Sequence, residues 1–106
     1  MDITEKILLR MEFVKTRPKM FIESPLSYNA YSNFISGYLM GLEMAYEKKI
    51  FNAIGDYFAK KNRVSTSVAW TYNIRILNKN LAEEDHINIL FQTLEGYFKA
   101  NPKWYE

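Results

Sequence analysis

The sequence predicts an all-α fold, a single-domain bundle of about five helices over residues 1–106. Apolar residues recur three or four positions apart in several long segments, the spacing that lines one face of a helix. Only residues 68–76 also alternate with period two, and the chain has no second strong strand with which they could pair. With 48% hydrophobic and 25% charged residues, the composition is that of one globular domain.

The first helix is predicted from the spacing of its apolar residues, which are Ile3, Ile7, Leu8, Met11 and Val14. It should end before Arg17, because Pro18 disfavours helical geometry in the residue that precedes it. Residues 17–25 then form an irregular connector whose apolar residues, Met20, Phe21 and Ile22, are expected to lie against the core.

A second helix should begin after Ser27, which is a suitable N-cap, and run to about Glu47. Gly37 and Gly41, four residues apart, predict close packing of this helix against another. The expected buried stripe consists of Tyr31, Phe34, Ile35, Tyr38, Leu42 and Tyr46.

A third helix is indicated by Ile50, Ile54, Tyr57 and Phe58, and the polar residues 60–63 should end it. The hydroxyl-bearing residues 65–67 can cap a fourth helix. The residues by which this helix should contact the rest of the protein are Val68, Trp70, Ile74 and Leu77. The segment 68–77 is compatible with helix or strand, and we favour helix because a lone strand would have no partner.

The last helix should start near Asn80, because Asn80 followed by Glu83 resembles a capping box, and Pro102 should stop it. Trp104 and Tyr105 follow the stop, where they either clasp the core or form an exposed anchor. The predicted core contains Phe34, Tyr38, Leu42, Ile54, Phe58, Trp70, Leu90, Phe91 and Leu94.

The residues that usually carry catalysis or metal binding are scarce. The chain has no Cys and one His, and its four glycines are too scattered for a phosphate-binding loop. We interpret His86 as a solvated polar residue. We therefore expect no enzyme activity, no cofactor, no metal site and no small-molecule substrate. The acidic N-terminus lacks a long apolar run, which predicts a cytoplasmic protein with no membrane partner.

The charges leave two kinds of partner open. A net charge of only +2 does not by itself indicate a nucleic-acid partner. Phosphates could still be contacted by the basic residues, which are Lys48, Lys49, Lys60, Lys61 and Arg63. The acidic run Glu83, Glu84 and Asp85 complements the dipole at a helix start, and it could equally meet a basic partner. Eight Tyr, seven Phe and two Trp exceed what a small core needs, and surplus aromatic residues are typical of protein-binding surfaces.

Several short motifs occur in a recognisable order along the chain. A helix ending in Arg-Pro-Lys-Met-Phe-Ile at 17–22 precedes Phe-x-x-Gly-Tyr-x-x-Gly at 34–41, then Trp70 and the aromatic-rich segment 89–98. This layout resembles small α-helical bacterial immunity proteins of polymorphic toxin and contact-dependent growth inhibition systems. The resemblance implies a protein that binds a cognate toxin domain, often a nuclease and here most simply a ribonuclease, and blocks its active site. The alternative to an immunity protein is a small helical nucleic-acid-binding or regulatory protein.

The resemblance carries no site residues over, so the partner-binding residues are predicted from their placement outside the helix stripes. They are Glu83, Glu84, Asp85, Trp104 and Tyr105. The carboxylates could compete with phosphates in a basic cleft, and the rings could supply buried anchors.

Overall fold

The computed structural model describes residues 1–23 and 25–106, and regular structure in this part of the chain is entirely helical. The helices are α1 (Ile3–Thr16), α2 (Tyr28–Tyr46), α3 (Ile50–Asn62), α4 (Trp70–Leu77) and α5 (Glu83–Ala100), with a short 3-10 turn, η1 (Pro18–Met20). The predicted all-α class is confirmed, and the ambiguous segment 68–77 contains a helix rather than a strand.

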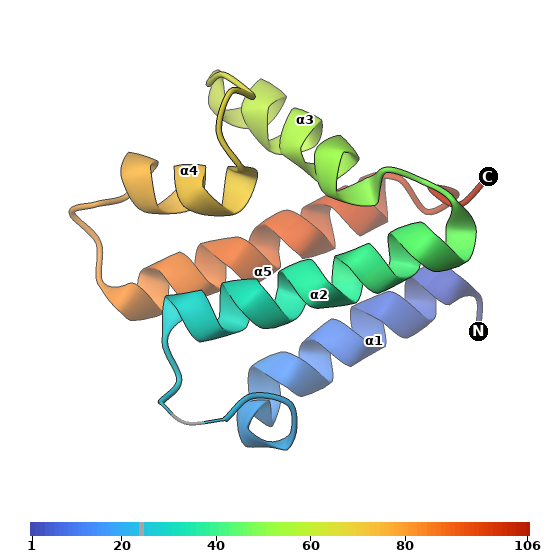
Figure 1. Cartoon of the computed structure of the whole chain (residues 1–106), viewed down its shortest axis with the longest axis horizontal. Coiled ribbons are helices and arrows are strands. Elements are labelled where there is room, and N and C mark those ends of the chain that lie inside the picture. Colours follow the sequence, from blue (N-terminus) through green and yellow to red (C-terminus); the bar gives the residue numbers. More distant parts are fainter. Residues whose placement is uncertain (24) are drawn as a thin grey trace.

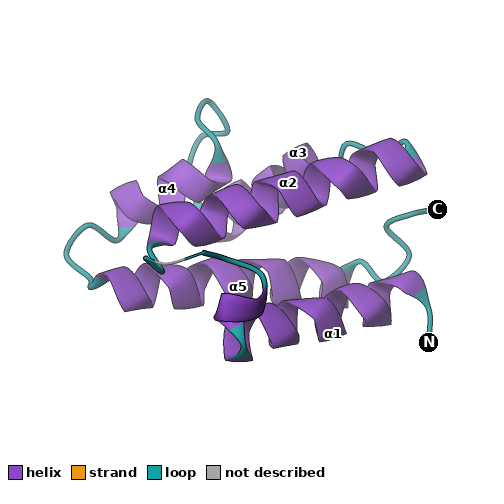
Figure 2. Ribbon diagram, turned by 60° about the horizontal axis from the view of Figure 1, so that its bottom comes forward, coloured by secondary structure: helices purple, strands orange, loops and turns teal. Residues whose placement is uncertain are grey.

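The helices form two layers with α5 at the centre of the contacts (Figures 1 and 2). Helices α1 and α5 lie in one layer and α2, α3 and α4 in the other. Helix α5 contacts each of the other four helices. Helix α1 runs antiparallel to α5, which brings both ends of the chain to the same side (Figure 1), where the Thr4 hydroxyl donates to the Pro102 carbonyl at 2.7 Å.

One core connects the two layers, and α5 contributes its largest share. On α5, apolar Leu90, Leu94 and Phe98 have no exposed surface. The helix buries residues on several faces, because it has neighbours on several sides. The predicted core members from α3, α4 and α5 are all buried: Ile54, Phe58, Trp70, Leu90, Phe91 and Leu94.

The predicted stripe of α2 is confirmed at Tyr31 and Ile35 and is otherwise wrong by part of a turn. The buried residues are Tyr28, Tyr31, Ile35 and Leu39, whereas Phe34, Tyr38, Leu42 and Tyr46 are half-buried. Phe34 instead packs edge-on against Phe21 of the connector, with 5.9 Å between ring centroids, and stacks on Tyr38. The reason is that α2 rests on α3 and α5, while the connector covers only its flank.

The two glycines of α2 do not mediate packing within the chain, so that prediction is also wrong. Gly37 and Gly41 are exposed, and a Cβ added at either would meet nothing within 4 Å. In the connector, Ile22 is buried as predicted and Phe21 half-buried, but Met20 is exposed. Ser24, which the predicted connector includes, lies outside the described residues.

Helix boundaries follow local chemistry at most ends. Ser27 caps α2 by accepting from Ala30 N at 3.1 Å, as predicted. Arg63 ends α3 in the left-handed region, with φ 55°. Two predicted caps are wrong: α4 begins after Ala69 with no side-chain cap, and α5 begins after Ala82 rather than near Asn80. At α5, the Asp85 carboxylate accepts a hydrogen bond from Ala82 N at 3.2 Å. Asp85 therefore takes the capping-box position that was predicted for Glu83.

Candidate functional site at the α4–α5 corner

Exposed apolar side chains gather on α4 and on the turn that leads to α5. Five of the eleven large hydrophobic residues that the described chain leaves exposed lie in the segment 68–81. Tyr72 and Ile76 are one helical turn apart and line a groove shared with Tyr28 and Arg75. The opposite face of α4 is buried through Trp70 and Ile74, among others. This short helix is therefore apolar on the side that faces the core and on the side that faces solvent.

The predicted acidic residues Glu83, Glu84 and Asp85 form the first turn of α5, directly after this turn, and all three are exposed. Their position complements the positive end of the helix dipole. Asp85 is partly engaged by the backbone of Ala82, and Glu83 makes the strongest contacts. Among the described residues, Glu84 has no salt-bridge partner.

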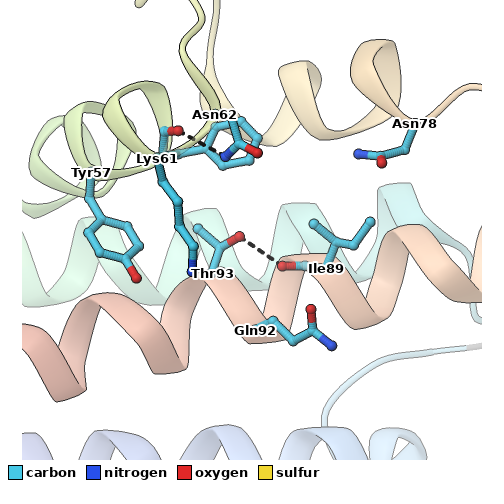
Figure 3. Close-up of a pocket in the computed structure, with 8 residues that line it drawn as sticks. Tyr57, Lys61, Asn62, Asn78, Ile89, Gln92 and Thr93 are labelled. Atoms are coloured by element: carbon cyan, nitrogen blue, oxygen red, sulfur yellow. Dashed lines mark hydrogen bonds between the residues drawn. The ribbon is translucent and has the colours of Figure 1, made fainter.

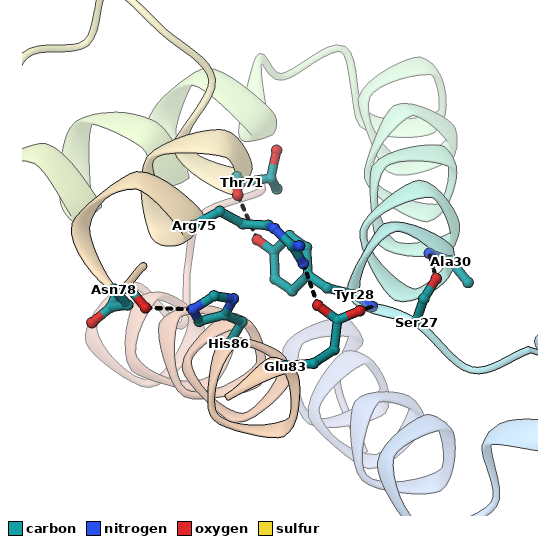
Figure 4. A network of polar contacts seen from close by, with 8 residues as sticks. All are labelled: Ser27, Tyr28, Ala30, Thr71, Arg75, Asn78, Glu83 and His86. Carbon is teal, nitrogen blue, oxygen red and sulfur yellow. Dashed lines mark hydrogen bonds and ion pairs between the residues drawn. The ribbon is translucent and has the colours of Figure 1, made fainter. Parts of the chain in front are cut away.

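Glu83 connects three helices through its two carboxylate oxygens (Figure 4). One oxygen accepts from the Arg75 guanidinium of α4 at 2.6 Å, and the other accepts from Tyr28 N of α2 at 3.2 Å. The Tyr28 backbone hydrogen bond and the Arg75 guanidinium hold the pKa of Glu83 below its ordinary value of 4.5. A single carboxylate thus positions the solvent-facing side of α4 relative to α2 and α5.

Tyr28 is the buried residue among the contacts that Glu83 makes with α2 and α4. Its ring lies under the Arg75 guanidinium, 4.9 Å from Cζ to the ring centroid, and its hydroxyl donates to the Thr71 carbonyl at 2.5 Å. Burial raises the pKa of Tyr28, so the hydroxyl stays protonated as a donor. These contacts hold α4 at Thr71 and at Arg75, one helical turn apart. A surface that is already held in place loses less conformational entropy when a partner binds.

His86 is buried rather than solvated, which corrects the prediction. Its ring packs edge-on against Tyr28, with 6.1 Å between centroids, and its Nε2 lies 2.6 Å from the carbonyl oxygen of Asn78. The sequence suggested exposure because acidic residues precede His86. The ring is buried because α4 and the following turn close over the first turn of α5 (Figure 4).

The predicted aromatic anchors lie at the other end of α5, so the structure does not bring the two predicted groups together. The 18 residues of α5 span about 27 Å. Trp104 packs against Phe98 and Tyr46 with centroid distances of 6.0 and 5.2 Å, and Tyr105 also approaches Tyr46. Both rings are half-buried and cover their own chain, the arrangement expected of a clasp.

The basic residues of the alternative hypothesis are divided between the two ends of α3. Lys48 and Lys49 precede the helix, whereas Lys60, Lys61 and Arg63 close it about 20 Å away. Lys48 Nζ donates to the carbonyl of Glu106 at 2.7 Å. Near the far end, a pocket between α3 and α5 contains Lys61 beside the Tyr57 ring (Figure 3). The five cations do not form one continuous face.

Within the part of the chain that the structure describes, no helix combines the length and the apolar character that crossing a bilayer requires. Among the same residues, no cluster of three or more His, Cys, Asp or Glu side chains is arranged to hold a metal ion.

Comparisons with models of known protein families, with curated protein sequences and with solved structures find no match for this chain. The α4–α5 corner was missed as an apolar site by sequence reasoning, although its acidic half was predicted. The available signal was the alternation of Val68, Trp70, Tyr72, Ile74 and Ile76, which marks apolar residues on both sides of the segment.

Proposed function

We propose that this chain binds a partner protein through the α4–α5 surface, which comprises Tyr72, Ile76, Leu77 and Leu81 with the carboxylates of residues 83–85. The observation that carries the proposal is the concentration of exposed apolar side chains on a helix already held in place by Glu83. Apolar groups bordered by charged side chains, here the carboxylates of residues 83–85 together with Arg75 and Lys79 of the groove, match the core and rim of a protein interface. A standard interface would take about 800 Å² of the chain's 6737 Å² of accessible surface.

We further propose that the partner is a basic bacterial toxin domain, a ribonuclease, which the chain neutralises by covering its active site. The family resemblance supports this partner, and the exposed acidic turn of α5 supports its charge. Carboxylates placed beside an apolar anchor can occupy the cleft in which a nuclease binds phosphates. Steering by these charges would chiefly accelerate association.

The proposal requires a toxin domain encoded beside this chain, and co-expression of the two proteins tests it. Replacing Ile76 and Leu81 together by Ser should abolish protection of bacterial cells and weaken binding by about 2–4 kcal/mol, roughly 30- to 1,000-fold in Kd. The matched control replaces Met40 and Met44, which are exposed on α2, by Ser. Equal protection by both double variants, with unchanged helix content, would refute the assignment of the surface.

The charge requirement is tested separately with Glu84→Lys and Asp85→Lys combined. This variant should lower the association rate more at low salt than at high salt, while the dissociation rate changes little. Glu83 stays unchanged, because its loss would also release α4. An association rate that is independent of both the charges and the salt would exclude a basic partner surface.

The alternative function is nucleic-acid binding, which the exposed cations Lys60, Lys61 and Arg63 at the end of α3 favour. It requires affinity for duplex DNA or RNA that falls steeply with salt, in proportion to the phosphates contacted. Measured binding at low salt that is lost in a triple Gln variant of these residues would support this function. Absence of binding at low salt would remove it.

A further inference from the structure

A pocket of about 240 Å³ lies where α3, the end of α4 and α5 meet (Figure 3). Phe58 of α3 and Ile89 of α5 supply its apolar walls, and the other side chains that line it carry polar atoms. Sites for drug-sized ligands usually measure about 300–1,000 Å³, so this smaller pocket suits a small metabolite better than a dinucleotide or a peptide.

Lys61 is the one charged residue among the described residues that line the pocket. Its ammonium lies over the Tyr57 ring, 5.8 Å from the centroid, and none of the ion pairs of the described chain involves it. In Figure 3 the Lys61 side chain extends from α3 toward α5, along the pocket. Because no carboxylate among the lining residues neutralises this ammonium, the pocket favours an anionic group at this end.

Three neutral side chains of the pocket are fixed as hydrogen-bond acceptors by their own contacts. Asn62, Asn78 and Thr93 each donate to the main-chain carbonyl four residues earlier, at 2.9, 2.8 and 2.8 Å. The two amides therefore keep their Oδ1 atoms as acceptors, and the hydroxyl of Thr93 has given its only proton to its own helix. In Figure 3 the Asn62 oxygen points from α3 toward Asn78. A ligand that matches these oxygens must bring O–H or N–H donors.

One cation beside several neutral acceptors restricts the class of ligand. A cation or a zwitterionic amino acid would bring positive charge close to Lys61, with no carboxylate among the lining residues to neutralise it. A nucleobase would need an aromatic face, but Phe58 is 3% exposed. The Tyr57 ring is already in contact with Lys61 and Tyr97. A polyhydroxylated anion fits both features, because its hydroxyls donate to the oxygens while its charge meets Lys61.

We propose that this pocket binds a small polyhydroxylated anion, a sugar acid or a sugar phosphate, with its anionic group on Lys61 and its hydroxyls on the three acceptor side chains. Gln92 lines the pocket from α5, and its amide can donate to the ligand as well as accept from it. The proposal goes beyond protein binding and does not depend on it, because no residue of the α4–α5 surface lines this pocket.

The test uses four probes with the same carbon-chain length: sorbitol, gluconate, sorbitol 6-phosphate and hexanoate, titrated at constant ionic strength into ¹⁵N-labelled protein. The side-chain amide signals of Asn62, Asn78 and Gln92 should shift saturably with gluconate, sorbitol 6-phosphate or both. The better of these anions should bind at least several-fold more tightly than sorbitol, which lacks the charge, and hexanoate, which lacks the hydroxyls. It also identifies a carboxylate or a phosphate as the preferred anionic group. The Asn33 amide, exposed on α2, is the internal control and should not shift.

Two variants with matched controls sharpen the test. Lys61→Gln should reduce the affinity for the anionic polyol to that for sorbitol, whereas Lys60→Gln, the same charge change outside the pocket, should leave it unchanged. Gln92→Leu should weaken the anionic polyol several-fold without weakening hexanoate, and Asn88→Leu, exposed on α5 outside the pocket, should change neither. The proposal is overturned if no probe shifts the three amides saturably, or if sorbitol or hexanoate binds as tightly as the anionic polyols. It is also overturned if Lys60→Gln weakens binding as much as Lys61→Gln, which would indicate a diffuse basic surface instead of a pocket.

Discussion

Gly96 is the glycine of this chain at which an added methyl group should be harmful. It lies inside α5, and a Cβ built there would collide with the Tyr57 hydroxyl and lie 3.3 Å from Tyr57 Cζ. The Tyr57 ring cannot move freely, because it packs edge-on against Tyr97 with 5.9 Å between centroids. Gly96→Ala should therefore force the ring of Tyr57 away from α5.

The magnitude follows from two opposing effects. Replacing Gly by Ala within a helix should stabilise it by about 1 kcal/mol. Forcing a methyl into occupied space typically costs about 1–3 kcal/mol. We expect Gly96→Ala to lower the free energy of unfolding by up to about 2 kcal/mol on balance. In a Tyr57→Phe background, which lacks the colliding hydroxyl, the same change should be neutral or mildly stabilising.

Urea unfolding followed by circular dichroism measures the four proteins of this double-mutant cycle. Gly37→Ala and Gly41→Ala are the matched controls, because a methyl group meets nothing there. Each should raise stability by about 0.5–1 kcal/mol, a melting-temperature gain of several degrees at roughly 4–8 °C per kcal/mol. The reasoning fails if Gly96→Ala stabilises as much as these controls, or if Tyr57→Phe leaves its effect unchanged.

Three further outcomes are expected. Trp70→Ala should cost about 3–5 kcal/mol, seen as a large drop in the urea midpoint, because the ring is almost fully buried. Truncation after Pro102 should lower the melting temperature by uncovering Phe98, and unchanged stability together with lost protection would instead identify Trp104 and Tyr105 as partner anchors. The pKa of Glu83 is lowered by folding, so its stabilisation is present above pH 4.5 and is lost as the pH falls further; Glu83→Gln should flatten the acid limb of a stability–pH curve.

Local sequence signals predicted the acidic half of the candidate site but not its apolar half. Three consecutive acidic residues before an apolar stripe indicate a helix start, and residues 83–85 do form the first turn of α5. The exposure of Tyr72 and Ile76 depends on which side of α4 meets the core. That choice depends on Tyr28 and Glu83, distant in sequence, and no local pattern encodes it.

The failed predictions share this cause. Leu39 is buried and Leu42 only half-buried, although both have apolar side chains on α2. An apolar stripe that includes Leu39 and one that includes Leu42 both fit the helical period, so periodicity alone could not show which face of α2 is buried. The glycines at 37 and 41 indicated close packing, but their face of α2 lies away from α3 and α5.

The sequence by itself determined that this chain is helical and where most helices begin and end. Those features depend on neighbouring residues: Pro18 ends α1, Ser27 caps α2, and apolar residues recur with the helical period. The tertiary structure alone decided which faces are buried, that α4 begins without a cap, and that Glu83 joins three helices. These features arise from contacts between residues far apart in the chain, whose partners are defined only when α5 is surrounded by the other four helices.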